Sequence, residues 1–150
     1  MATVELTFSA LPAHVRTARL IATAVARRAG VSEDLLDEVR LAVGEACSRA
    51  VEAHRLHCPD EPIRIELCDD SGRFEVTVID VAPSEETDAS VGSETPAANG
   101  YELASLLPDM SGLGLAVIAG LADDVEVSPS PKGMRVKMSW PAVSSLPSSA

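Results

Sequence analysis

Apolar and polar residues alternate in five segments of the chain, and this alternation predicts β-strands. The segments are residues 4–8, 63–67, 74–80, 125–127 and 134–140. The turn sequence Asp69-Asp70-Ser71-Gly72 joins the second and third segments into a predicted hairpin. Residues 129–133, with two prolines and a glycine, predict the turn before the last strand.

Helical spacing predicts three helices between these strands. The first opens at Pro12 and ends at Gly30, residue types suited to the start and the end of a helix. Ser32 is placed to cap the second helix, which should end before Pro59. The third helix, near residues 112–121, is apolar all round, which is typical of a buried helix.

The second helix carries two contrasting stripes and includes the stretch LAVGEACSRAVEAH, residues 41–54. Its apolar stripe should face a core and consists of Leu35, Val39, Ala42, Ala46 and Ala50. Its polar stripe places four residues side by side: Glu45, Ser48, Arg49 and Glu52. Such a helix is either half of a nucleotide site or an ordinary amphipathic helix with a solvent-facing side. Periodicity alone favours the second interpretation.

The order of the elements predicts an α+β two-layer sandwich, with helices on one face of a mostly antiparallel sheet. One domain should span residues 1–140, followed by a flexible tail rich in serine and proline over residues 141–150. Residues 82–110 form an unusually long connection, with a short helix possible near 101–107. A connection of that length inside a domain is usually functional or disordered.

The composition narrows the classes of function. The 150-residue chain carries a net charge of -11, which argues against binding to a nucleic-acid backbone. The sequence has neither an apolar run long enough to span a membrane nor the pattern of a signal peptide, so a cytoplasmic protein is expected. The three cysteines form no Cys-x-x-Cys pair and are expected to be free thiols.

Three segments in a fixed order resemble the anti-sigma-factor serine kinases of the GHKL ATPase superfamily: the helix with Glu45, the strand ending at Asp80 and the helix start at Gly112. The resemblance implies a Bergerat-type sandwich and assigns Glu45 as the general base that acts on a serine hydroxyl. Where the family has a magnesium-binding asparagine, this chain has Arg49. A guanidinium offers no lone pair to a metal. Arg49 should therefore impair phosphoryl transfer, either by pairing with Glu45 or by contacting phosphates directly.

The resemblance assigns two further parts of a nucleotide site. It implies that Asp80 accepts a hydrogen bond from the adenine amino group, although Ala82 and Ser84 replace the two glycines of the family motif. From position alone, Asp80 is as well explained as a carboxylate that caps a turn at the end of a strand. The start of the last helix resembles the family's phosphate-binding segment and comprises Ser111, Gly112, Leu113 and Gly114.

The connection over residues 82–110 corresponds to the family's ATP lid. It carries several acidic residues and neither lysine nor arginine, which makes it a poor cover for a triphosphate. His54, His57 and Cys58 lie close together near the end of the second helix. Because no fourth ligand is evident, a zinc site is not predicted there.

The resemblance implies a regulatory binding module with impaired or absent kinase activity. Its partners would be a sigma factor and an anti-anti-sigma protein of the STAS type, and the chain would form a homodimer. Two alternatives stay open. One is an active kinase that uses ATP and magnesium, and the other is a domain that senses a different nucleotide, with Arg49 as a phosphate contact that needs no metal.

Overall fold

The sheet positions every other element of this protein. The structure, a computed structural model, describes residues 2–83 and 110–142, with the side chains of residues 3–83 and 115–142. In chain order the elements are β1 (Ala2–Phe8), α1 (Pro12–Ala29), α2 (Glu33–His57), β2 (Ile63–Asp70), β3 (Arg73–Asp80), α6 (Met110–Leu121), β5 (Asp124–Ser130) and β6 (Gly133–Pro141). The strands form one sheet in the order β1-β2-β3-β6-β5, and all neighbours are antiparallel.

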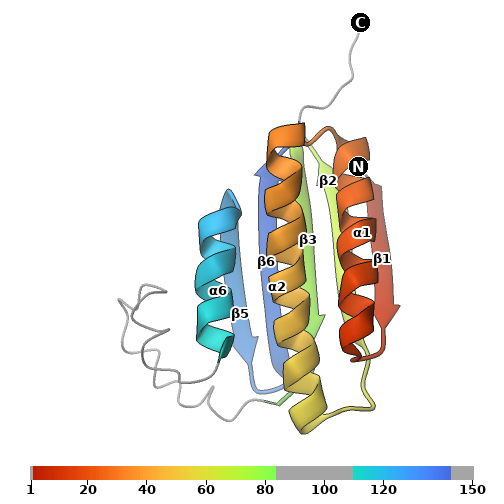
Figure 1. Cartoon of the computed structure of the whole chain (residues 1–150), viewed down its shortest axis with the longest axis vertical. Helices are drawn as coiled ribbons and strands as arrows, with labels where there is room; N and C mark the ends of the chain where they lie inside the picture. Colours follow the sequence, from red (N-terminus) through yellow and green to blue (C-terminus); the bar gives the residue numbers. More distant parts are fainter. Residues whose placement is uncertain (1, 84–109, 143–150) are drawn as a thin grey trace, which may run out of the picture.

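Three helices cover one face of this sheet, with α2 in the middle of the layer, α1 on one side and α6 on the other (Figure 1). The predicted α+β two-layer sandwich is therefore confirmed. The short helix expected near residues 101–107, most of the connection before α6 and most of the C-terminal tail lie outside the described residues. None of the described helices combines the length and the apolar character needed to cross a bilayer.

The alternation in the strands builds the core because it puts apolar side chains on the helix-covered face. In the ladder from β2 to β6, Leu67 lies opposite Val76, and Val76 lies opposite Met138. All three side chains are buried. The other face is open and carries charged and polar residues around a shallow hollow of about 420 Å³. The predicted turn between β2 and β3 is formed by Ser71 and Gly72, both at positive φ, as a two-residue hairpin requires.

Small residues let the two long helices pack closely. The buried face of α1 is largely alanine: Ala18, Ala22, Ala26 and Ala29. Opposite, a Cβ atom at Gly44 of α2 would lie 2.6 Å from the Cδ atom of Arg19. The predicted stop at Gly30 is confirmed, since this glycine has a φ of 98° and closes α1. Ser32 does precede α2, but its side chain makes no capping hydrogen bond.

Two expectations for the C-terminal half were wrong. The helix predicted to be buried all round is exposed at Val117, Ala119 and Gly120, because α6 lies at the end of the helical layer (Figure 1). Its Ile118 is buried in the core. In addition, β5 continues through Pro129 to Ser130, past the start of the predicted turn. An edge strand tolerates a proline because one side of its backbone needs no ladder partner.

Candidate functional site

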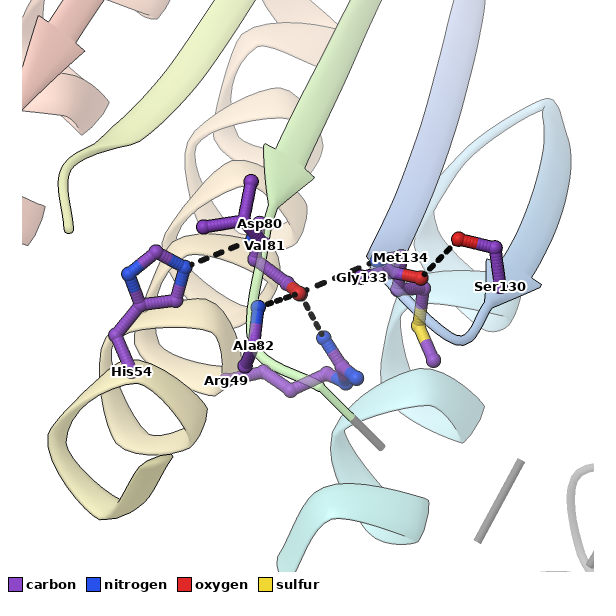
Figure 2. A network of polar contacts seen from close by, with 8 residues as sticks. All are labelled: Arg49, His54, Asp80, Val81, Ala82, Ser130, Gly133 and Met134. Carbon is purple, nitrogen blue, oxygen red and sulfur yellow. Dashed lines mark hydrogen bonds and ion pairs between the residues drawn. The ribbon is translucent and has the colours of Figure 1, made fainter. Parts of the chain in front are cut away.

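Two residues singled out in the sequence, Arg49 and Asp80, meet at one end of the sheet. Arg49 projects from α2, and Asp80 is the last residue of β3. The Nη1 atom of Arg49 lies 3.4 Å from Oδ2 of Asp80, and their side chains are 12% and 4% exposed. Figure 2 shows this ion pair inside a larger polar cluster. The pair joins the helical layer to the sheet, which makes this end of the molecule the candidate site.

The other carboxylate oxygen of Asp80 is engaged by the backbone. Oδ1 accepts hydrogen bonds from the N–H groups of Ala82, at 3.1 Å, and Met134, at 3.2 Å. The bond from the residue two positions further on is an Asx turn, so the turn-capping interpretation of Asp80 is correct. The carboxylate thus connects the end of β3 to the start of β6, and protein donors hold both of its oxygens in the described structure.

Gly133, which sequence reasoning placed only in a turn, is required for this arrangement. It has a φ of 140°, and a Cβ atom here would overlap the carbonyl oxygen of Asp80 and lie 2.7 Å from Cα of Val81. The turn before it is closed by Ser130, whose hydroxyl donates to the carbonyl of Gly133 at 3.1 Å. The sequence signal was a glycine directly before the last strand. Its meaning depended on which backbone packs against it.

His54 is the second residue whose role was missed. Its side chain is fully buried near the end of α2. Its Nε2 atom accepts a hydrogen bond from the N–H of Val81 at 3.0 Å (Figure 2). Its Nδ1 atom lies 2.8 Å from the carbonyl oxygen of Glu61. Both ring nitrogens therefore have protein partners, which leaves neither for a metal.

Glu45, the expected general base, lies one helical turn before Arg49 and is half-exposed. Of the two contacts considered for Arg49, the pairing with Glu45 is not what the structure has, because Arg49 turns to Asp80 instead. A buried carboxylate has more to gain from a positive partner than a half-exposed one. Within the described residues, Glu45 takes part in no ion pair and stays available at the surface of α2.

The segment expected to bind phosphate belongs to the start of α6. This helix begins at Met110, so Ser111, Gly112, Leu113 and Gly114 lie in its first five residues. The start of α6 and the end of β3 lie at the same end of the molecule (Figure 1). The free N–H groups of a helix start favour anions. The backbone here is thus suited to an anion, while the side chains of these four residues lie outside the description.

Magnesium does not fit at Arg49. The guanidinium has five N–H donors and no lone pair, and its positive charge would repel the ion. Among the residues described, no group of three or more acidic, histidine or cysteine side chains is placed to hold a metal. The Nε atom of Arg49 is buried and has no hydrogen-bond partner in the described structure. The position of the Arg49 side chain is explained by the charge of Asp80 and not by a complete hydrogen-bond network.

The pKa values of two cysteines, Cys47 in α2 and Cys58 directly after it, are raised. Burial raises the pKa of Cys47 to about 12, and nearby Arg19 opposes this shift. Burial also raises the pKa of Cys58, with the negative charges of Glu61 and Asp80 acting in the same direction. The thiols are free, as expected, and the protonated form of each is favoured.

Comparisons with known proteins agree with this architecture. The profile of the histidine kinase-like ATPase domain matches residues 8–140. Serine-protein kinase RsbW of Halalkalibacterium halodurans is 32% identical over 129 residues, covering 83% of this chain and 75% of that protein. The RsbW of Bacillus subtilis is 30% identical over 127 residues, covering 83% of this chain and 76% of that protein.

Two solved structures share the fold at low sequence identity. One contains the RsbU and RsbW domains of a Mycobacterium tuberculosis protein, with a TM-score of 0.66 and 15% identity, over 95% of this chain but 33% of that one. The chain therefore spans a third of that longer protein. The other is the SiaB–SiaC complex of Pseudomonas aeruginosa, with a TM-score of 0.66 and 11% identity, over 91% of this chain and 88% of that one.

Proposed function

The chain belongs to the histidine kinase-like ATPase domain family, among the anti-sigma-factor serine kinases, and on that premise we propose that it is a partner-switching regulator with impaired kinase activity. It binds a sigma factor and is countered by an anti-anti-sigma protein of the STAS type. ATP and ADP bind weakly or not at all, and magnesium contributes nothing to the binding.

The observation that carries this proposal is the Arg49–Asp80 ion pair. The resemblance assigns Asp80 to adenine, yet Arg49 already faces Oδ2 at 3.4 Å, and two backbone N–H groups hold Oδ1. An adenine amino group would have to compete with the guanidinium for a buried acceptor. Phosphoryl transfer also depends on metal ions that neutralise the developing charge. Arg49 thus opposes the binding of adenine, because it already faces Asp80, and it opposes the binding of the metal ion that accompanies a nucleotide.

A second candidate, an active serine kinase, is favoured by one observation. Glu45 is half-exposed and is not paired with Arg49, so the expected general base keeps its freedom to act. In that case Glu45 would take the proton of a serine hydroxyl on the partner. Incubating the protein with labelled ATP, magnesium and a STAS-type partner tests this candidate, and transfer of label that Glu45→Gln abolishes would establish it.

Calorimetric titration separates the two candidates. We expect the wild-type protein to bind ATP and ADP weakly or not at all, with no change when magnesium is added. Arg49→Asn restores a neutral oxygen ligand and should tighten the binding of magnesium–ATP by at least about tenfold, or about 1.4 kcal/mol. Arg55→Asn is the matched control, because Arg55 is exposed on the same helix, and it should leave binding unchanged. Tight binding of magnesium–ATP by the wild-type protein would overturn the proposed impairment.

Partner binding is tested without nucleotide. We expect purified wild-type protein to capture a sigma factor or a STAS-domain protein of its own bacterium in nucleotide-free buffer. Capture of neither class of protein would contradict the regulatory proposal, whatever the calorimetry shows. We also expect a homodimer, as the family resemblance implies, and light scattering on the purified chain measures this directly.

A further inference from the structure

The ring of His54 has one hydrogen-bonding arrangement that suits its surroundings. The N–H of Val81 can only donate, so the Nε2 atom that faces it at 3.0 Å must accept. The carbonyl oxygen of Glu61 can only accept, so the Nδ1 atom at 2.8 Å must carry the proton. The two backbone partners therefore specify the neutral ring with its proton on Nδ1.

These two bonds connect three parts of the fold. His54 lies near the end of α2, Glu61 lies in the loop between α2 and β2, and Val81 directly follows β3. Val81 is also flanked by the residues of the Asx turn, since Asp80 precedes it and Ala82 donates to the carboxylate. The side chain of His54 is fully buried, so water cannot replace either bond without opening the structure.

We infer that His54 is a positioning residue that holds the carboxylate of Asp80 in place by clamping the chain that follows it. The clamp fixes the N–H of Val81, which sets the path of the backbone from Asp80 to Ala82. That path brings the Ala82 N–H to 3.1 Å from Oδ1, and Gly133 lets the Met134 N–H approach the same oxygen. His54 acts on Asp80 through the backbone and does not contact the carboxylate itself (Figure 2).

This inference does not depend on the proposed function. Asp80 has to be positioned whether its partner is Arg49 alone or a nucleotide. A histidine that only filled space in the core would contribute to stability without acting selectively on the Asp80 turn. The two hydrogen bonds of the ring allow these roles to be separated, because a substitution can keep one bond and remove the other.

Two variants of His54 each keep one of its two hydrogen bonds. In His54→Gln, the side-chain amide reaches the place of Nε2, and its oxygen can accept from Val81. In His54→Asn, the shorter amide reaches the place of Nδ1 and keeps only the bond to Glu61. The readout is amide hydrogen exchange at Ala82 and Met134, compared with Val76 in the middle of β3, which corrects for any loss of global stability.

We expect His54→Asn to lower the relative protection of the Ala82 and Met134 amides by about tenfold or more, and His54→Gln to keep it within about threefold of the wild type. Equal losses in both variants, or no loss in either, would overturn the inference. If neither variant folds, the wild-type protein decides. Its spectra should show Nε2 unprotonated and coupled to the Val81 N–H, with Val81, Ala82 and Met134 exchanging through one common opening. Separate openings, or a proton on Nε2, would contradict the clamp.

Discussion

Two ion pairs on opposite faces of the sheet differ in burial and in geometry, and the two differences run in opposite directions. On the helix-covered face, Arg49 and Asp80 are 12% and 4% exposed, and their charged atoms are 3.4 Å apart. On the open face, Arg73 and Asp123 are 35% and 53% exposed and only 2.9 Å apart. The pair that costs more to desolvate therefore has the poorer contact.

This contrast indicates whether the buried Arg49–Asp80 pair serves the stability of the fold or the function of the site. A buried ion pair offsets its desolvation only when the geometry is good and the remaining donors are satisfied. Arg49 meets neither condition, since its contact is long and its buried Nε atom has no partner in the described structure. If stability were the only requirement, a pair of apolar side chains would suit the positions of Arg49 and Asp80 better. The buried cluster is therefore better explained by the site it forms than by the stability it adds.

The largest expected effect comes from the glycine that lets the two strand ends meet. Gly133→Ala places a methyl group against the carbonyl oxygen of Asp80 at a φ of 140°, and should lower the free energy of unfolding by more than about 4 kcal/mol. Urea denaturation measures this loss. Gly120→Ala is the control, because a Cβ atom there meets nothing within 4 Å, and it should be neutral or stabilise the helix. Similar losses in both variants would refute the packing argument.

Removing the buried carboxylate should have the next largest effect. Asp80→Ala leaves the Arg49 guanidinium and two backbone N–H groups without their acceptor, so we expect a loss of about 3 kcal/mol. Asp123→Ala on the open face should cost less than about 1 kcal/mol. Chemical denaturation of both variants compares the two faces directly. An Asp80→Ala variant as stable as Asp123→Ala would mean that the buried pair contributes nothing.

Local patterns predicted the elements because the cause of each element is local. Alternation identified each strand that the structure describes, and Pro12 and Gly30 mark the two ends of α1 in the structure as they do in the sequence. The mistakes arose where an element's surroundings matter. An apolar run such as that of α6 shows nothing about its place at the end of a layer, and a proline in a strand is tolerated only at an edge.

Only part of the site was predictable from the sequence, because the roles of His54 and Gly133 and the contacts between the site residues were missed. The resemblance brought out Glu45, Arg49 and Asp80, and Arg49 and Asp80 do meet. Two contacts were considered for Arg49, with Glu45 one turn away on the helix or with phosphates, whereas the long side chain reaches across to Asp80 in the next layer. The clamp by His54 and the close approach at Gly133 join segments far apart in the sequence. No local pattern encodes such contacts, because they follow from the order of strands in the sheet.

The burial of the Cys47 thiol should also make the free energy of unfolding depend on pH. The thiol of Cys47 faces the core, and its pKa is raised from 9.0 to about 12, so the folded state keeps a proton that the unfolded chain loses above pH 9. The unfolded state then binds fewer protons, and stability should fall by about 1.4 kcal/mol per pH unit between these two values. Cys47→Ala should remove most of this slope and leave only the part due to Cys58, whose pKa is also raised, whereas Cys68→Ala, on the open face, should leave it in place. Urea denaturation between about pH 8 and 11 measures it, and an unchanged slope in Cys47→Ala would show that another group is responsible.

The smallest expected effect concerns the open-face pair and its response to salt. A double-mutant cycle on Arg73 and Asp123 should give a coupling of about 0.5 kcal/mol, because both side chains are partly exposed to solvent. Raising the ionic strength from about 0.05 M to 1 M should remove most of this coupling, since the Debye length falls to about 3 Å. The same cycle on Arg49 and Asp80 should change little with salt, because ions cannot enter between buried side chains. If both couplings were screened equally, the end of β3 would be open to solvent, and Asp80 would be free to exchange Arg49 for another partner.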